Sequence, residues 1–121
     1  MSGADGGVAP DLSGLVEQMG DEGLAADVVE VYLEALPERV AAIRAARDGG
    51  DEEAVRAAHS LKSASALLGL HDLSGRAAAL EAALRQDPAG DPAPLVEAVL
   101  ERTPGAEAAL RQWLAGRRPT G

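Results

Sequence analysis

The chain has 121 residues, of which 46% are hydrophobic and 26% are charged, and its formal net charge is −9. This length and composition predict one globular domain, and the negative charge argues against nucleic acid and anionic membranes as partners. Because the chain has no cysteine, disulfides and thiolate metal sites are excluded, and no apolar stretch approaches the roughly 20 residues of a membrane span.

The N-terminal part reads as a tail followed by two helical segments. Residues 1–10 are rich in glycine and alanine and lack a basic region and a long apolar run, so we expect a disordered tail and no signal peptide. A short helix capped by Asp11 or Ser13 is predicted next. A longer helical region follows over residues 22–48, and we expect Pro37 to kink or split it.

Glycine and aspartate residues mark the ends of two central helices. After Gly49 and Gly50, Asp51 is the expected N-cap of a helix over residues 52–68. Asp72 is the expected N-cap of the next helix, over residues 73–86. Both helices repeat apolar residues with a period near 3.6, which predicts a buried stripe that includes Leu61, Leu68, Leu80 and Leu84.

The C-terminal part contains a proline-rich loop and one more helical region. The loop is predicted at residues 87–94, where proline, glycine and aspartate cluster. The helical region is predicted from residue 94 to residue 115, and Pro104 with Gly105 lies in its middle. A proline costs roughly 3 kcal/mol in a helix interior and a glycine about 1 kcal/mol, so we expect a kinked helix or two segments. Residues 117–121 are expected to form a tail.

Successive amphipathic helices joined by short turns predict an all-α fold, an antiparallel four-helix bundle with a short additional N-terminal helix. We expect this bundle to occupy residues 11–116. Aromatic residues make up only 2% of the chain. The core is therefore expected to consist of alanine, leucine and valine, which suits close helix packing more than a ligand cavity.

The helix predicted over residues 52–68 carries a histidine on its polar face. In a helical projection Lys62 and Ser63 lie within about 60° of His59, whereas Leu61 and Leu68 lie on the opposite side. Neutral imidazole has one nucleophilic lone-pair nitrogen. A solvent-facing histidine beside a cation and small residues fits a phosphoryl acceptor.

These residues resemble the motif of the histidine phosphotransfer (HPt) domain of two-component phosphorelays. That pattern has a histidine, a lysine three residues later, a small residue at the next position and often a glycine ten residues after the histidine. Here the matching residues are His59, Lys62, Ser63 and Gly69. A glutamate or glutamine about 22 residues after the histidine is frequent in the family, and Glu81 stands there. The phosphotransfer domain of chemotaxis histidine kinases is similar.

The resemblance implies roles for three side chains. His59 would accept the phosphoryl group, and Lys62 would stabilise the charge on the phosphoryl oxygens, because this transfer depends mainly on positioning and charge stabilisation. Glu81, on the neighbouring helix, would accept a hydrogen bond from Nδ1–H of the imidazole and leave Nε2 free to react. Simpler interpretations stay open: Lys62 as a solvated lysine, and Glu81 as a surface residue paired with Arg85.

Four residues around the histidine are candidates for contact with a partner. Small side chains at Ser63 and Ala66 would let a partner approach the ring, and Val55 would add an apolar patch. Arg85, one turn beyond Glu81, would add a second cation or contact the partner. The same four residues also suit an ordinary helix surface.

The second histidine, His71, is the competing candidate for a site. It has Ser74 where the motif requires lysine, and it falls in a predicted turn before Asp72, so we expect it to be structural or merely exposed. The spacing between His59 and His71 matches no metal-ligand motif, so no metal site of the chain's own is expected. Neither a glycine-rich phosphate loop nor a kinase-type ATP motif is found.

The resemblance implies a phosphorelay intermediate without an ATP site or a cofactor of its own. His59 would take a phosphoryl group from an aspartyl phosphate on a receiver domain of a hybrid histidine kinase or response regulator, and would pass it to the aspartate of a second receiver. Mg²⁺ would be supplied by the receiver.

Other functions stay open. The chain could be the phosphotransfer domain of a chemotaxis-type kinase, with ATP on a separate catalytic domain as the donor. It could also be a non-catalytic helical adaptor, or a degenerate relative that binds receivers without carrying phosphate. A small bundle with one exposed active face suits a monomer, and the lack of cysteine fits a cytoplasmic protein.

Overall fold

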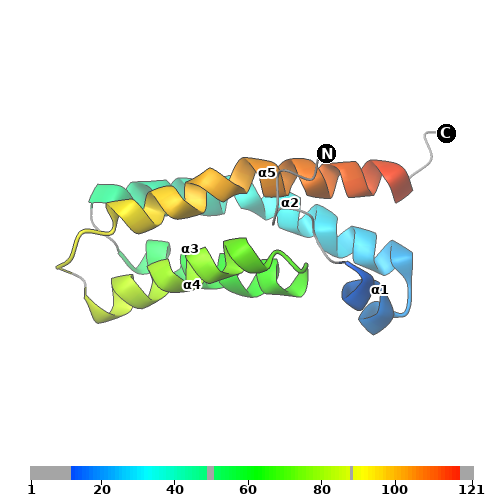
Figure 1. The fold of residues 1–121 in the computed structure, drawn as a ribbon, viewed down its shortest axis with the longest axis horizontal. Helices are drawn as coiled ribbons and strands as arrows, with labels where there is room; N and C mark the ends of the chain where they lie inside the picture. The colour runs from blue at the N-terminus through cyan, green and yellow to red at the C-terminus, as the bar shows by residue number, and fades with distance from the viewer. Residues whose placement is uncertain (1–11, 49–50, 88, 118–121) are drawn as a thin grey trace.

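The computed structural model describes residues 12–48, 51–87 and 89–117 (Figure 1). Within these ranges the chain forms five α-helices, with a 3₁₀ turn at Ala46–Asp48 after the second: α1 (Ser13–Met19), α2 (Glu22–Ala45), α3 (Glu52–Leu67), α4 (His71–Gln86) and α5 (Ala93–Arg117). No strand occurs in the described part of the chain, so the all-α prediction is confirmed. None of the described helices is long and apolar enough to cross a bilayer.

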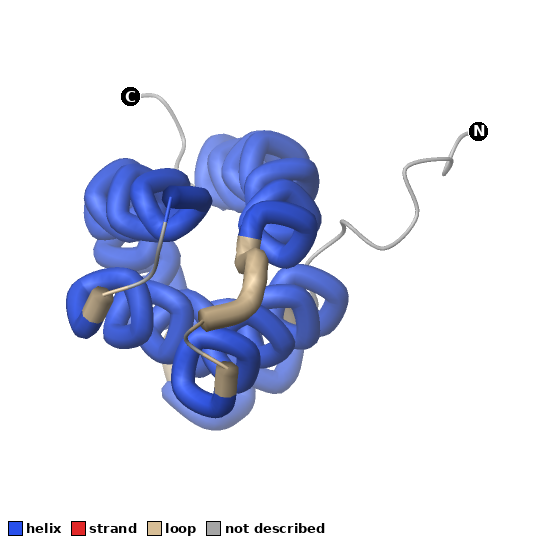
Figure 2. Tube along the Cα trace, turned by 90° about the vertical axis from the view of Figure 1, so that its left-hand side faces the viewer, coloured by secondary structure: helices blue, strands red, loops and turns tan. Residues whose placement is uncertain are grey.

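Helices α2 to α5 form an antiparallel four-helix bundle in two layers. Figure 1 shows the long helices α2 and α5 side by side in one layer and the shorter α3 and α4 in the other. The end view in Figure 2 shows the four helices arranged around a common centre. Close contacts join α2 to α3, α3 to α4, α4 to α5 and α5 to α2. The short α1 packs on α2 beyond the α3–α4 pair, as predicted for the additional helix.

The predicted leucines lie in the centre of the bundle. Leu61, Leu68 and Leu80 are 0% exposed and Leu84 is 8% exposed. Burial of one such side chain contributes about 1.5–3 kcal/mol, so this stripe is a main source of cohesion for α3 and α4. A polar pair, Tyr32 and Ser65, is also buried there, and its two hydroxyl groups share a hydrogen bond of 3.0 Å between α2 and α3.

Caps and left-handed glycines set several helix ends. Asp51 caps α3 as predicted, because its Oδ1 accepts a hydrogen bond of 2.9 Å from the N–H of Ala54. Gly69 ends the same helix with φ +75°, a conformation that glycine adopts without strain. At the N-terminus Ser13 is the first residue of α1 and Leu12 takes the cap position, so capping by Ser13 is wrong. Asp11 and the tail predicted at residues 1–10 lie outside the described residues.

Helix α4 begins at His71, so the predicted start at residue 73 with Asp72 as its cap is wrong. The carboxylate of Asp72 instead lies 2.7 Å from Nε of Arg102 on α5 and 3.2 Å from Nε of Arg76. These ion pairs hold Asp72 within the first turn of α4, where a negative charge also favours the helix N-terminus. Leu70 takes the cap position without a side-chain hydrogen bond.

Helix α2 runs without interruption through Pro37, so of the two predicted outcomes, a kink or a split, the split is wrong. Pro37 itself is exposed, while Leu36 before it and Ile43 beyond it are both buried in the same core. Packing on the two sides of the proline therefore outweighs its cost of about 3 kcal/mol.

Helix α5 is also continuous, although two segments were an expected outcome at Pro104. A proline has no N–H to donate to the carbonyl four residues earlier, here that of Leu100. The hydroxyl of Thr103 lies 2.8 Å from the Val99 carbonyl and 3.4 Å from the Leu100 carbonyl. Thr103 thus supplies a donor at the place where the helix loses one. The helix ends at Arg117, and the rest of the predicted C-terminal tail lies outside the described residues.

Candidate functional site

His59 lies on the exposed side of α3, next to α4. The buried face of α3 packs into the core and leaves the His59 side chain 53% exposed. Lys62 follows one turn later, and because helical side chains lean toward the N-terminus it reaches back toward His59. The short connection between α3 and α4 returns the chain antiparallel to α3 and brings Glu81 to the histidine.

The carboxylate of Glu81 joins three basic side chains. Its Oε2 lies 3.0 Å from Nδ1 of His59 and accepts a hydrogen bond of 2.9 Å from Nε of Arg85, while Oε1 lies 2.8 Å from Nζ of Lys62. Only 9% of the Glu81 side chain is exposed, compared with 34% for Lys62 and 55% for Arg85. A buried carboxylate requires such partners, and here they come from both α3 and α4.

These contacts keep Glu81 ionised and favour one tautomer of the neutral imidazole. The hydrogen bond from Lys62 is the main cause that lowers the pKa of Glu81 from 4.5 to about 2; burial opposes this, and the bonds from Arg85 and His59 add to it. Glu81 is therefore ionised at neutral pH. An ionised carboxylate can only accept hydrogen bonds, so Nδ1 of the neutral ring carries the proton and Nε2 keeps its lone pair.

A neutral histidine held in this way has the chemistry of a nucleophile, with a carboxylate counter-ion already beside the ring. When Nε2 forms a bond to an electrophile, the ring acquires a positive charge while Nδ1 keeps its proton. The Glu81 carboxylate beside Nδ1–H is positioned to stabilise that charge. The cluster of His59, Lys62, Glu81 and Arg85 is called the Glu81 cluster below.

The structure brings together some of the residues predicted for the site and leaves others at its edge. His59, Lys62 and Glu81 meet as described, and Arg85, predicted only as a partner contact or second cation, also binds Glu81. Glu81 pairs with Arg85 at i,i+4 as the simpler interpretation expected, but it is buried and not a surface residue, and it also contacts His59. Three other candidates lie on α3 outside the cluster: Ser63 and Ala66 are exposed and Val55 is half-buried.

Two residues of α4 differ from what the sequence predicted. His71 is exposed as predicted, but it is the first residue of α4 and not part of a turn. Ser74, noted only because it is not lysine, donates a hydrogen bond of 2.9 Å from its hydroxyl to the backbone carbonyl of Lys62. Its sequence signal is weak: Ser74 stands seven residues before Glu81, which places both on one side of α4.

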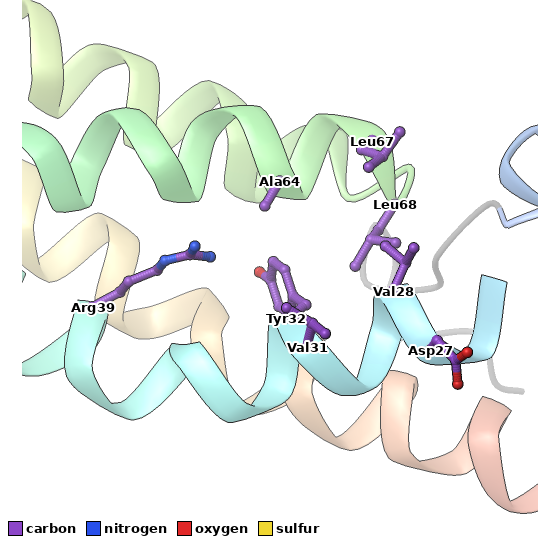
Figure 3. Close-up of a pocket in the computed structure, with 8 residues that line it drawn as sticks. All are labelled: Asp27, Val28, Val31, Tyr32, Arg39, Ala64, Leu67 and Leu68. Atoms are coloured by element: carbon purple, nitrogen blue, oxygen red, sulfur yellow. The ribbon is translucent and has the colours of Figure 1, made fainter. Parts of the chain in front are cut away.

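A separate apolar groove runs between α2 and α3 (Figure 3). Its volume is about 270 Å³, and it includes two exposed apolar side chains, Val31 (62% exposed) and Leu67 (43% exposed). Asp27 and Arg39 on α2 lie toward its two ends in the close-up. The groove is on the α2 side of α3, whereas the Glu81 cluster is on the α4 side, so α3 has two exposed flanks of different chemistry.

Comparison with known proteins identifies the family. Residues 27–116 match the family model of the Hpt domain, a range that extends from the second turn of α2 almost to the end of α5 and includes the whole Glu81 cluster. Searches of curated proteins and of solved structures found no match. The match covers most of the chain and confirms the resemblance drawn from the motif. The chain therefore belongs to the Hpt domain family, whose members carry out histidine phosphotransfer in phosphorelays and interact with receiver domains.

Proposed function

We propose that His59 is the phosphoryl acceptor and that it exchanges phosphoryl groups with the aspartates of receiver domains. The observation that carries this proposal is the 3.0 Å contact between Nδ1 of His59 and the ionised carboxylate of Glu81, on a ring that is 53% exposed. Family membership supplies the reaction class. The geometry supports His59 over His71 because only His59 belongs to the Glu81 cluster.

The proposed step is a displacement at phosphorus. The lone pair of Nε2 attacks the phosphorus of the aspartyl phosphate, the P–N bond forms, and the P–O bond to the donor breaks. The aspartate leaves as a carboxylate with the bonding electron pair. The ring then carries a phosphoryl group on Nε2 and a proton on Nδ1, so it is cationic, and Glu81 stabilises that charge. The reverse step returns the group to a receiver.

The cations of the cluster act on the phosphoryl oxygens in this proposal. Lys62 is held beside the imidazole by its 2.8 Å contact with Glu81, and its side chain is 34% exposed, so its ammonium is within reach of the partner's active site. Phosphoryl transfer depends mainly on positioning and charge stabilisation. We propose that the receiver contributes Mg²⁺ and that Val55, Ser63 and Ala66 contact the receiver around the ring. A monomeric working form stays a prediction.

The test is incubation of the protein with a panel of phosphorylated receiver domains and Mg²⁺. Wild type is compared with His59→Gln, and His71→Gln serves as the matched control. Acid-labile, base-stable label on wild type and His71→Gln, but not on His59→Gln, is the expected result. Label that persists in His59→Gln would refute the assignment.

Two further arms distinguish the alternative functions. Label acquired only from a kinase catalytic domain with ATP would indicate a chemotaxis-type phosphotransfer domain. Receiver binding that is retained without any label would indicate an adaptor.

A further inference from the structure

Around the Glu81 cluster, the residues through which α3 and α4 face each other are spaced along each helix like those at the seam of a coiled coil. Residues that alternate at intervals of four and three lie along one side of a helix. On α4 this row is Ser74, Ala78, Glu81 and Arg85, and on α3 it is Val55, His59, Lys62 and Ala66. Contacts of Ser74 with Lys62, and of Glu81 with His59 and Lys62, join the two rows.

Lys62 is attached to α4 at two points. Its backbone carbonyl accepts the 2.9 Å hydrogen bond from the Ser74 hydroxyl, and its ammonium lies 2.8 Å from Oε1 of Glu81. In a helix the carbonyl points toward the C-terminus and the side chain leans toward the N-terminus. The two attachments therefore diverge along α3 and reach two residues of the same row on α4. Together with the buried leucines of the two helices, they restrict the position of one helix along the other.

The register of the two helices decides which side chain meets His59. A slip by one helical turn, about 5.4 Å, would place Ala78 or Arg85 opposite the ring in place of Glu81. The neighbouring positions in the two rows, Ala66 and Ala78, have side chains of a single methyl group. The hydroxyl of Ser74 supplies a directional contact at this point of the seam, and it does so through the backbone, independently of the charges in the cluster.

We propose that Ser74 is a positioning residue, which fixes the register of α3 against α4 so that Glu81 meets Nδ1 of His59. Its effect on phosphoryl transfer rests on the proposed function of His59. Its effect on the ring does not, because the Nδ1–H tautomer is a property of the protein without phosphate. The two can therefore be measured separately.

The experiment measures the His59 tautomer by ¹⁵N NMR of the unphosphorylated protein labelled at histidine, with His71→Gln as the background. Ser74→Ala should shift the ring from mainly Nδ1–H toward a mixture of tautomers. Ser74→Thr keeps a hydroxyl and should restore the original signal. Ser65→Ala is the matched control, since it removes a hydroxyl bond between α2 and α3 and should leave the tautomer unchanged.

Phosphoryl transfer from a receiver gives the second measurement. Ser74→Ala should slow transfer about tenfold, within the range that small displacements of reacting groups produce, and Ser65→Ala should not. An unchanged tautomer and rate in Ser74→Ala would overturn the proposal, as would an equal change in Ser65→Ala. If Ser74→Ala fails to fold, Ser74→Cys, a much weaker donor, gives the same comparison. A wild type that takes no phosphoryl group would refute the role of His59, while the tautomer would still test Ser74.

Discussion

Replacing Glu81 with glutamine tests the orienting role of its carboxylate. The amide has nearly the same shape but no charge, so the bond to Nδ1 of His59 changes from charge-assisted to neutral. Hydrogen bonds to charged groups contribute about 1.5–3 kcal/mol and neutral ones about 0.5–1.5 kcal/mol. The expected loss is therefore about 1–1.5 kcal/mol, and since about 1.4 kcal/mol corresponds to a factor of ten, phosphoryl transfer should slow about tenfold. The amide N–H₂ of glutamine can also donate a hydrogen bond to Nδ1. This would favour the tautomer with the proton on Nε2, which has no lone pair free to react there, and would slow transfer further.

Rapid-quench measurement of transfer from a phosphorylated receiver is the assay for Glu81→Gln. The matched control is Glu107→Gln, because Glu107 pairs with Arg111 at i,i+4 with a distance of 2.9 Å, as Glu81 pairs with Arg85, but it lies on α5. The control should transfer at the wild-type rate. A Glu81→Gln rate equal to that of wild type would refute the idea that the carboxylate orients the ring.

Three further predictions concern stability. Leu61→Ala, at a side chain that is 0% exposed, should lower the free energy of unfolding by about 2–5 kcal/mol. The control Leu67→Ala, on the same helix but 43% exposed, should lower it by less than about 1 kcal/mol. Equal losses in denaturant titrations would contradict the assignment of the buried face of α3. Because the pKa of Glu81 is lowered from 4.5 to about 2, its stabilising contribution is complete above pH 4.5 and is lost as the pH falls toward 2. The Tm difference between wild type and Glu81→Gln should shrink over that interval in circular dichroism melts, and a constant difference would speak against this linkage. Thr103→Val removes the hydroxyl near the Leu100 carbonyl in α5 and should lower the free energy of unfolding by about 1 kcal/mol; undiminished stability in the same titrations would show that this hydroxyl is dispensable.

The exposed face of α3 was predictable because helix geometry alone relates its residues. Once Leu61 and Leu68 are placed in the core, His59 and Lys62 must lie on the other side, and the structure agrees. The meeting of Glu81 with His59 is different, since it depends on how a second helix packs. That contact was expected from the spacing typical of the family, and helix periodicity by itself does not predict it.

The features that the sequence did not predict involve side-chain contacts that intrinsic helix propensity does not describe. At the start of α4 the carboxylate of Asp72 lies in the first turn and pairs with Arg102 of α5, a residue far along the chain. At Pro104 the hydroxyl of Thr103 lies beside the carbonyls of Val99 and Leu100, and the helix is buried on both sides of the proline, at Val99 and at Ala106. Local propensity, the basis of both predictions, contains neither effect.

The Glu81 cluster and Ser74 all lie within a single helical hairpin, α3 and α4, in which His59 and Glu81 are separated by 22 residues. Closing so short a loop costs little chain entropy, and contacts of low sequence separation form early in folding. The chemistry of the molecule is thus expected to be assembled before α2 and α5 complete the bundle. The outer ends of α2 and α5 extend beyond this hairpin (Figure 1), so the Glu81 cluster lies away from them, within a short and continuous stretch of the chain.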